Sequence, residues 1–212
     1  SLGIRGVSYY LIQFCENTNV RERVSMARVM AGMTMSLDGF INDRSGSAES
    51  LSPDFEELLE THSFKDMTAN TGAVIMGNNT YHMADPFLWV NDDYEFQVPL
   101  FILAHAVPEK FPPGNDKLTL TFVTDGIESA IRQAKAAAGD KLVQIIGGAD
   151  TIQQSLNSGL CDELAIDVMP ILLGEGLRLF EKIETDKIKL ERKSVAETTS
   201  MRTSIIFKVS KA

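Results

Sequence analysis

From residue 26 onward, short apolar runs rich in β-branched residues alternate with segments of helical spacing. Strands are expected at 28–35, 73–76, 100–103, 118–123, 142–146, 163–168, 188–196 and 203–209. Helices are expected at 53–69, 80–83, 127–138 and 150–157. Near-continuous apolar strands separated by helices are typical of a mostly parallel sheet covered on both faces. The last two strands alternate apolar and polar residues, which predicts an antiparallel end to the sheet.

No internal repeat and no linker follow this starting point, so residues 26–212 are predicted to form one α/β domain. Residues 1–25 have a different pattern, with a polar stretch at 16–19 and no strand-helix alternation. We interpret 1–25 as an N-terminal extension, natural or left over from expression, and keep open that it is an ordered arm used in subunit contacts.

The charge balance limits the partners. The chain has 29 acidic and 20 basic residues and a formal net charge of −9, which disfavours nucleic acids and anionic membrane surfaces. The longest early apolar run, 7–14, is far short of the ~20 residues that span a bilayer. Cys15 and Cys161 are too few for a disulfide framework and lack metal-ligand spacing. We therefore expect a cytoplasmic protein with a small-molecule substrate and no metal.

Two segments have the same form, a buried strand that runs into glycine and then into the start of a helix. The first continues from Gly77 into Asn78, Asn79 and Thr80, and the second from Ile146 through Gly147 and Gly148 into Ala149, Asp150 and Thr151. Glycine lets the backbone approach a ligand, and amides at a helix start bind anions. A tight capped turn explains either segment alone, and the G-x-G-x-x-G spacing is absent. Together they predict a dinucleotide that spans both.

A third segment, Ser-Leu-Asp-Gly-Phe at 36–40, ends the first strand. It places the carboxylate of Asp38 at the ligand-bearing edge of the sheet. Asp-Gly is also a common turn pair, so a purely structural role stays open.

Four motifs in this order carry a resemblance to a known family. They are Ser-Leu-Asp-Gly-Phe at 36–40, Met-Gly-Asn-Asn-Thr-Tyr at 76–81, Ile-Gly-Gly-Ala at 146–149, and a long final motif that runs from Leu-Cys-Asp-Glu-Leu at 160–164 through Pro-Ile-Leu-Leu-Gly-Glu-Gly at 170–176 to Leu-Phe at 179–180. This set resembles the reductase domain of the bacterial bifunctional riboflavin-biosynthesis deaminase-reductase, within the dihydrofolate reductase superfamily. The resemblance covers about residues 26–210 and is most specific in the final motif.

The resemblance implies a dihydrofolate-reductase-like three-layer α/β sandwich, with a mostly parallel central sheet and an antiparallel C-terminal strand. It also implies NADPH across the two glycine segments and a homodimer. Gly147 and Gly148, often joined by a cis peptide in this superfamily, would face the pyrophosphate after Ile146, and Ala149 to Thr151 would supply amides. Gly77 to Thr80 would hold the adenosine-side phosphate, next to Leu103, Ala104 and His105.

Two positions depart from the pattern of the family. Relatives usually have Arg where Asn78 stands, and Ser or Thr followed by Arg where Ala104 and His105 stand. Arg offers a charged bidentate fork for the 2′-phosphate and Asn does not, so NADH stays possible as the cofactor. The deaminase motif, His-x-Glu with a downstream Cys-x-x-Cys, does not occur in this sequence.

The resemblance favours hydride transfer to a pyrimidine that carries a ribosyl phosphate, the 5-amino-6-(5-phosphoribosylamino)uracil reductase type of reaction. A dihydrofolate or pteridine reductase and a non-catalytic ligand-binding protein are the alternatives. Asp38 is the first candidate for substrate contact and Glu175, between two glycines, is the second. We expect Asp38 to be partly desolvated, with a raised pKa that suits proton relay.

Overall fold

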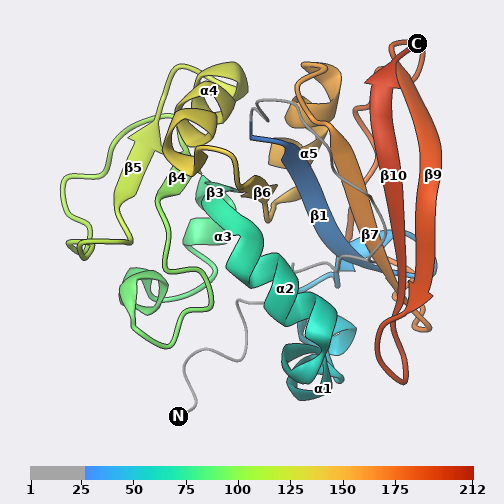
Figure 1. Cartoon of the computed structure of the whole chain (residues 1–212). Coiled ribbons are helices and arrows are strands. Elements are labelled where there is room, and N and C mark those ends of the chain that lie inside the picture. The colour runs from blue at the N-terminus through green and yellow to red at the C-terminus, as the bar shows by residue number, and fades with distance from the viewer. Residues whose placement is uncertain (1–26) are drawn as a thin grey trace.

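The computed structural model describes residues 27–212, so the expectation for 1–25 lies outside the described residues (Figure 1). Eight strands form one sheet in the order β5-β4-β3-β6-β1-β7-β10-β9. Their bounds are β1 Val29–Ser36, β3 Thr71–Gly77, β4 Leu100–Leu103, β5 Leu120–Val123, β6 Leu142–Ile145, β7 Glu163–Met169, β9 Ile188–Glu197 and β10 Thr203–Lys211. Each predicted strand is present, with ends shifted by at most a few residues.

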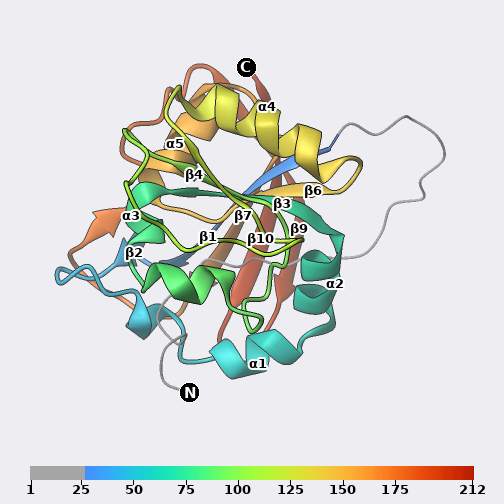
Figure 2. The same cartoon turned by 90° about the vertical axis from the view of Figure 1, so that its left-hand side faces the viewer.

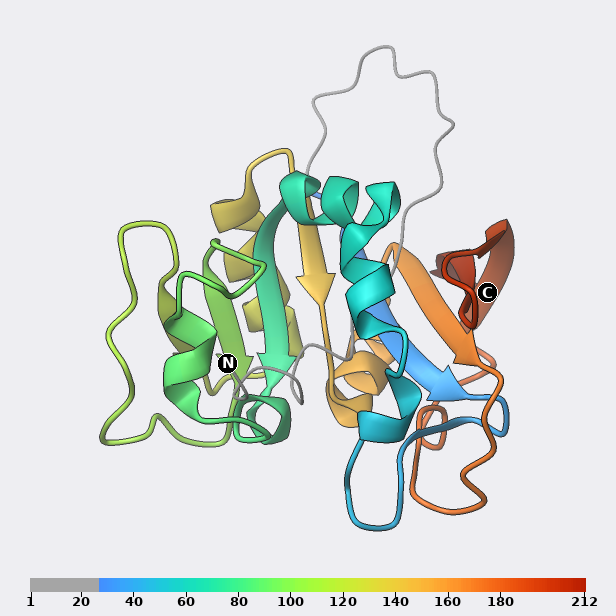
Figure 3. The same cartoon turned by 90° about the horizontal axis from the view of Figure 1, so that it is seen from below.

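The sheet is parallel from β5 to β7, and β10 pairs antiparallel with both β7 and β9. This arrangement confirms the expected mostly parallel sheet with an antiparallel end. A separate two-stranded pairing joins β2 (Phe40–Asn42) to β8 (Leu177–Arg178), and the sequence did not predict it. In Figure 3 the chain after β1 and the chain after β7 run together at one end of the sheet.

Helices cover both faces of the sheet. Figure 2 shows α4 and α5 on one side of the strands and α1 and α2 on the other, which confirms the three-layer sandwich. The helices are α1 Phe55–Glu60, α2 His62–Asn70, α3 Asn78–Tyr81, α4 Ile127–Ala138 and α5 Ala149–Asn157. Within residues 27–212, no helix combines the length and the apolar run that crossing a membrane requires.

The prediction of a single helix over 53–69 is wrong, because the helix is interrupted at Thr61. The backbone of Thr61 is extended, with φ −66° and ψ 143°. Its hydroxyl accepts a hydrogen bond from the amide of Phe64 at 3.2 Å. A threonine in this position caps the second helix and satisfies one of its unpaired amides. Two short helices therefore replace one long helix.

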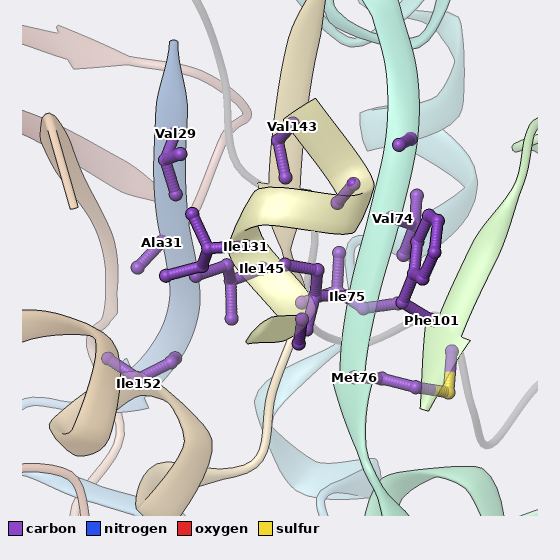
Figure 4. Packing of buried hydrophobic residues seen from close by; sticks show 14 of the residues in the cluster. Val29, Ala31, Val74, Ile75, Met76, Phe101, Ile131, Val143, Ile145 and Ile152 are labelled. Carbon is purple, nitrogen blue, oxygen red and sulfur yellow. The ribbon is translucent and has the colours of Figure 1, made fainter. Parts of the chain in front are cut away.

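The core lies between the sheet and its helices. Ile75 of β3, Ile145 of β6 and Ala31 of β1 are fully buried and belong to one apolar cluster. Ile131 of α4 and Ile152 of α5 pack against them, as Figure 4 shows. This packing buries the apolar stripe that the spacing of 127–138 predicts.

The buried guanidinium of Arg202 connects the start of β10 to β1, to β7 and to the residue that precedes α1. Arg202, just before β10, donates from Nη2 and Nε to Asp54 at 2.8 and 3.0 Å. Its Nη1 donates to Asp167 of β7 at 2.9 Å and to Thr34 of β1 at 2.8 Å. The side chains of Arg202, Asp54 and Asp167 are at most 1% exposed. One cation is thus shared between two carboxylates, which also receive hydroxyl hydrogen bonds.

The pKa values of the two carboxylates shift in opposite directions, because burial dominates at Asp167 and hydrogen bonds dominate at Asp54. Burial raises the pKa of Asp167 to about 6, although Arg202 and Ser204 act in the opposite direction. Burial also acts to raise the pKa of Asp54, but the hydrogen bonds from Arg202 and Thr199 outweigh it and the net shift is downward. Two like charges that share one partner are expected to separate in this way.

The substitution Asp167→Asn tests this balance. The folded pKa of about 6 lies above the ordinary value of 3.8. Asp167 therefore contributes stability that is complete below pH 3.8 and is lost as the pH rises through about 6. We expect Asp167→Asn to lower the free energy of unfolding by about 1 kcal/mol more at about pH 5 than at about pH 8. Urea unfolding at both pH values measures the difference.

The matched control is Asp140→Asn, which removes an exposed carboxylate. Its effect on the free energy of unfolding is expected to be small at both pH values. A deficit in Asp167→Asn that is equal at the two pH values would contradict the raised pKa.

Candidate functional site

The two glycine segments lie side by side at the carboxyl edge of the sheet. Strands β3 and β6 are parallel neighbours, and the amide of Gly77 donates to the carbonyl of Gly147 at 2.8 Å. A Cβ atom on Gly77 would lie 2.5 Å from Oγ1 of Thr151, so a larger residue there would force Thr151 to move. The peptide bond between Gly147 and Gly148 is cis, as expected. The two segments therefore form one continuous backbone surface.

A cavity of about 510 Å³ opens at this edge. Most of the residues predicted to bind the cofactor line it, namely Gly77, Asn78, Asn79, Thr80, Leu103, Ala104, His105, Gly148, Ala149, Asp150 and Thr151. Ile146 and Gly147 do not line it, because both are buried beneath the surface that Gly148 presents. The structure therefore brings the strand ends of β3, β4 and β6 into one concave site.

The rest of the cavity lining was not predicted. It includes Ile41, Asn42, Gly46, Met83, Thr124, Gly126, Gln153, Gln154, Leu177, Glu181 and Lys182. Residues 177–182 reach the cavity because Nε2 of Gln153 donates to the carbonyl of Leu179 at 2.7 Å, and Oδ1 of Asn42 accepts from the amide of Leu177 at 2.9 Å. These contacts join distant parts of the chain, and no local sequence signal marks them.

The start of α5 is the strongest anion-binding feature of the cavity. The first hydrogen bond within α5 runs from the amide of Ile152 to the carbonyl of Gly148 at 3.1 Å. Helix geometry leaves the amides of 149–151 without an acceptor inside the helix, and the dipole places partial positive charge there. Helix α3 is a single turn, so it offers amides and the polar side chains of Asn78 and Thr80 but little dipole.

Asp38 differs from the expectation. Its carboxylate accepts hydrogen bonds from Oγ of Ser36 at 2.6 Å, from the amide of Gly174 at 2.7 Å and from the amide of Leu173 at 3.2 Å. The Ser36 hydrogen bond, opposed by partial desolvation and assisted by the two amides, lowers the pKa of Asp38 to about 2. The predicted raised pKa is therefore wrong, because the hydroxyl of Ser36 and, in addition, two amides more than 130 residues away hold the carboxylate ionised.

Neither candidate carboxylate lines the cavity. Glu175 is exposed on the outer side of the same loop, where Oε1 lies 3.5 Å from Nη1 of Arg44. The loop 173–178 is instead held against β2, since Nη1 of Arg178 donates to the carbonyl of Asp38 at 3.3 Å and its guanidinium lies 4.3 Å from the Phe40 ring centre. Asp38 thus fixes the loop that carries Leu177 into the cavity wall.

Sequence comparison finds one family and two curated relatives. The sequence pattern of the RibD C-terminal domain matches residues 27–202. The uncharacterized Bacillus subtilis protein YyaP is 25% identical over 167 residues, which is 76% of this chain and 82% of YyaP. The uncharacterized YwjB of the same organism is 26% identical over 165 residues, 78% of this chain and 88% of YwjB.

Solved structures agree on the fold. A "Putative riboflavin biosynthesis protein" from Shewanella sp. PV-4 has a TM-score of 0.68 and 26% identity, and the match covers 87% of this chain and 99% of that one. The Thermotoga maritima diaminohydroxyphosphoribosylaminopyrimidine deaminase/5-amino-6-(5-phosphoribosylamino)uracil reductase has a TM-score of 0.65 and 15% identity, over 86% of this chain and 56% of that one. For Enterococcus faecalis dihydrofolate reductase complexed with NADP(H), the TM-score is 0.56 and the identity is 12%, and the match covers 88% of this chain and 98% of that one. The last two likenesses show the fold alone, and they confirm the dihydrofolate-reductase-like architecture.

Adding a methyl group at Gly77 tests the contact between the two segments. In Gly77→Ala the new Cβ would lie 2.5 Å from Oγ1 of Thr151, so we expect a loss of stability. Overpacking of this kind costs about 1–3 kcal/mol. Thr151→Ala removes the clashing oxygen, and the double variant should recover most of the loss. Denaturant unfolding of the wild type, the two single variants and the double variant gives the coupling free energy between the two positions. Strictly additive effects on the free energy of unfolding would refute the contact.

The role of Asp38 is tested by Asp38→Asn. Asparagine keeps one acceptor oxygen and replaces the other with a donor, so it cannot satisfy the amides of Leu173 and Gly174 as the carboxylate does. We expect hydrogen exchange at Gly174 to accelerate about tenfold or more. Asp43→Asn is the control, because Asp43 accepts hydrogen bonds within its own turn. Unchanged exchange at Gly174 would argue against the anchoring role.

Proposed function

The chain belongs to the RibD C-terminal domain family, and from this premise we propose that it is an NAD(P)H-dependent reductase. The proposed reaction is hydride transfer to a pyrimidine that carries a ribosyl phosphate, of the 5-amino-6-(5-phosphoribosylamino)uracil reductase type. The observation that carries the proposal is the cavity surface formed by Gly77 and Gly148 beside the start of α5, which the hydrogen bond from Gly77 to Gly147 holds together. Dihydrofolate or pteridine reduction and ligand binding without catalysis are the readings that the experiment below separates from it.

The residues present fit a dinucleotide. A surface without side chains at Gly77 and Gly148 lets a pyrophosphate approach the backbone, and the amides of 149–151 supply donors to it. A cavity of about 510 Å³ is within the size range of small-molecule and cofactor sites. The bound nicotinamide would supply the hydride.

The protein side of the reaction is binding and orientation. Gly77 to Thr80 and Leu103 to His105 line the part of the cavity proposed for the adenosine side. Asn78 and His105 occupy positions where the family resemblance implies Arg. We therefore propose that the protein accepts NADH in addition to NADPH. Asp38, held as an anion away from the cavity, acts as a positioning residue for the loop 173–178 and not as a proton donor. Glu175 enters only as the partner of Arg44 on that loop.

The homodimer and the cytoplasmic location stay predictions. The family resemblance suggests the dimer, and the cysteine usage suggests a reducing compartment.

Titration with NADPH and NADH tests the function. Nε1 of the buried Trp89 donates to the carbonyl of Tyr81 at 2.8 Å, at the end of the helix whose first residues line the cavity. Its fluorescence should therefore respond when either cofactor binds. Calorimetry should give dissociation constants in the range of about 1 μM to 1 mM that is typical of enzyme substrates.

Cofactor oxidation is then followed at its absorbance band with the pyrimidine ribosyl phosphate and with dihydrofolate. Oxidation with the pyrimidine is the expected result. Activity with dihydrofolate alone would overturn the substrate assignment. Binding of neither cofactor would favour a ligand-binding protein without this chemistry.

A further inference from the structure

The charges on the cavity wall are uneven. Among the described residues that line the cavity, Asp150 and Glu181 are acidic, and Lys182 is the one lysine or arginine. Asp150 lies in the first turn of α5, where a ligand phosphate would meet the helix. Its carboxylate would repel that phosphate unless a cation offsets it. Lys182 is the group placed to do so.

Hydrogen bonds fix the backbone at Lys182, whereas its side chain extends into solvent. Nδ2 of Asn157 donates to the carbonyl of Lys182 at 2.8 Å, and the amide of Glu184 donates to Oδ1 of Asn157 at 3.0 Å. These two bonds fix the segment along α5. The side chain beyond them is 77% exposed and keeps its freedom to turn.

The Lys182 ammonium forms only a loose pair. Its Nζ lies 4.0 Å from Oδ1 of Asp150, at the outer limit for an ion pair. Oδ2 of the same carboxylate already accepts from Nε2 of Gln154 at 2.5 Å. Exposed pairs of this kind contribute at most about 1 kcal/mol, so Lys182 gives up little when it leaves Asp150.

We propose that Lys182 is a binding residue that selects phosphate-bearing ligands at the start of α5. Its ammonium turns from Asp150 to the phosphate and adds charge where the helix supplies amide donors. The assignment rests on the proposed function, since the dinucleotide pyrophosphate is the phosphate group meant. It adds to that function a residue outside the glycine segments, carried by a chain segment that lies along α5.

The variant Lys182→Gln tests the proposal, with Lys187→Gln as the matched control. Lys187 lies five residues further along, is exposed, pairs with Glu184 and does not line the cavity. Calorimetry is performed with NADH and with inorganic pyrophosphate. We expect Lys182→Gln to weaken the binding of both by about fivefold, the equivalent of one exposed charge pair, and Lys187→Gln to leave binding unchanged. Equal effects of the two variants would overturn the proposal.

A second comparison separates contact with phosphate from simple neutralisation of Asp150. If Lys182 contacts the phosphate, Lys182→Gln still weakens ligand binding by about fivefold when it is made in the Asp150→Asn variant. Disappearance of the loss in that background would overturn the contact.

The ligands also separate this proposal from the function on which it rests. Wild-type binding of pyrophosphate but not NADH, with the same dependence on Lys182, would support the residue and reject the dinucleotide. Binding of neither would reject both.

Discussion

Parallel pairing at the centre of the sheet is the constraint from which the rest of the structure follows. Parallel strands need crossover connections, so the helices must cover both faces and every strand of the group must end at the same edge. The hydrogen bonds between β3 and β6 continue past the end of β6. The amide of Ile146 donates to the carbonyl of Ile75 at 3.0 Å, and the amide of Gly77 donates to the carbonyl of Gly147 at 2.8 Å. The last hydrogen-bonded pair of the sheet therefore lies at the cavity, with Gly77 in its lining.

Much of this architecture follows from local patterns. The strand Leu100–Leu103 and the helix Ile127–Ala138 lie where the sequence predicts them, because apolar runs and the spacing of buried residues depend only on neighbours. The glycine segments were recognisable for the same reason. Their placement at one edge follows from parallel pairing, whereas their direct adjacency comes from the strand order that the structure shows.

What the sequence could not predict depends on partners far away in the chain. The apolar spacing of 53–69 hid a capping threonine at 61, and the two-residue strand β8 is too short to show a pattern. The pKa of Asp38 is lowered first by the hydroxyl of Ser36, two residues away, and further by the amides of Gly174 and Leu173, more than 130 residues later, so the raised pKa expected from the sequence was wrong. The part of the cavity lining in residues 177–182 was missed because distant partners place it, since Asn42 accepts a hydrogen bond from the amide of Leu177 and Gln153 donates one to the carbonyl of Leu179.

The buried guanidinium of Arg202 also has a consequence for the order in which the molecule assembles. Arg202 and Asp54 are 148 residues apart, and closing so large a loop carries an entropy cost that local contacts avoid. A carboxylate without its cation is stable only in water, so Asp54 and Asp167 stay hydrated until β10 arrives. We therefore expect the central strands and their crossover helices to pack first. The hairpin of β9 and β10 is expected to dock last, because it brings the cation that allows Asp54 and Asp167 to be buried.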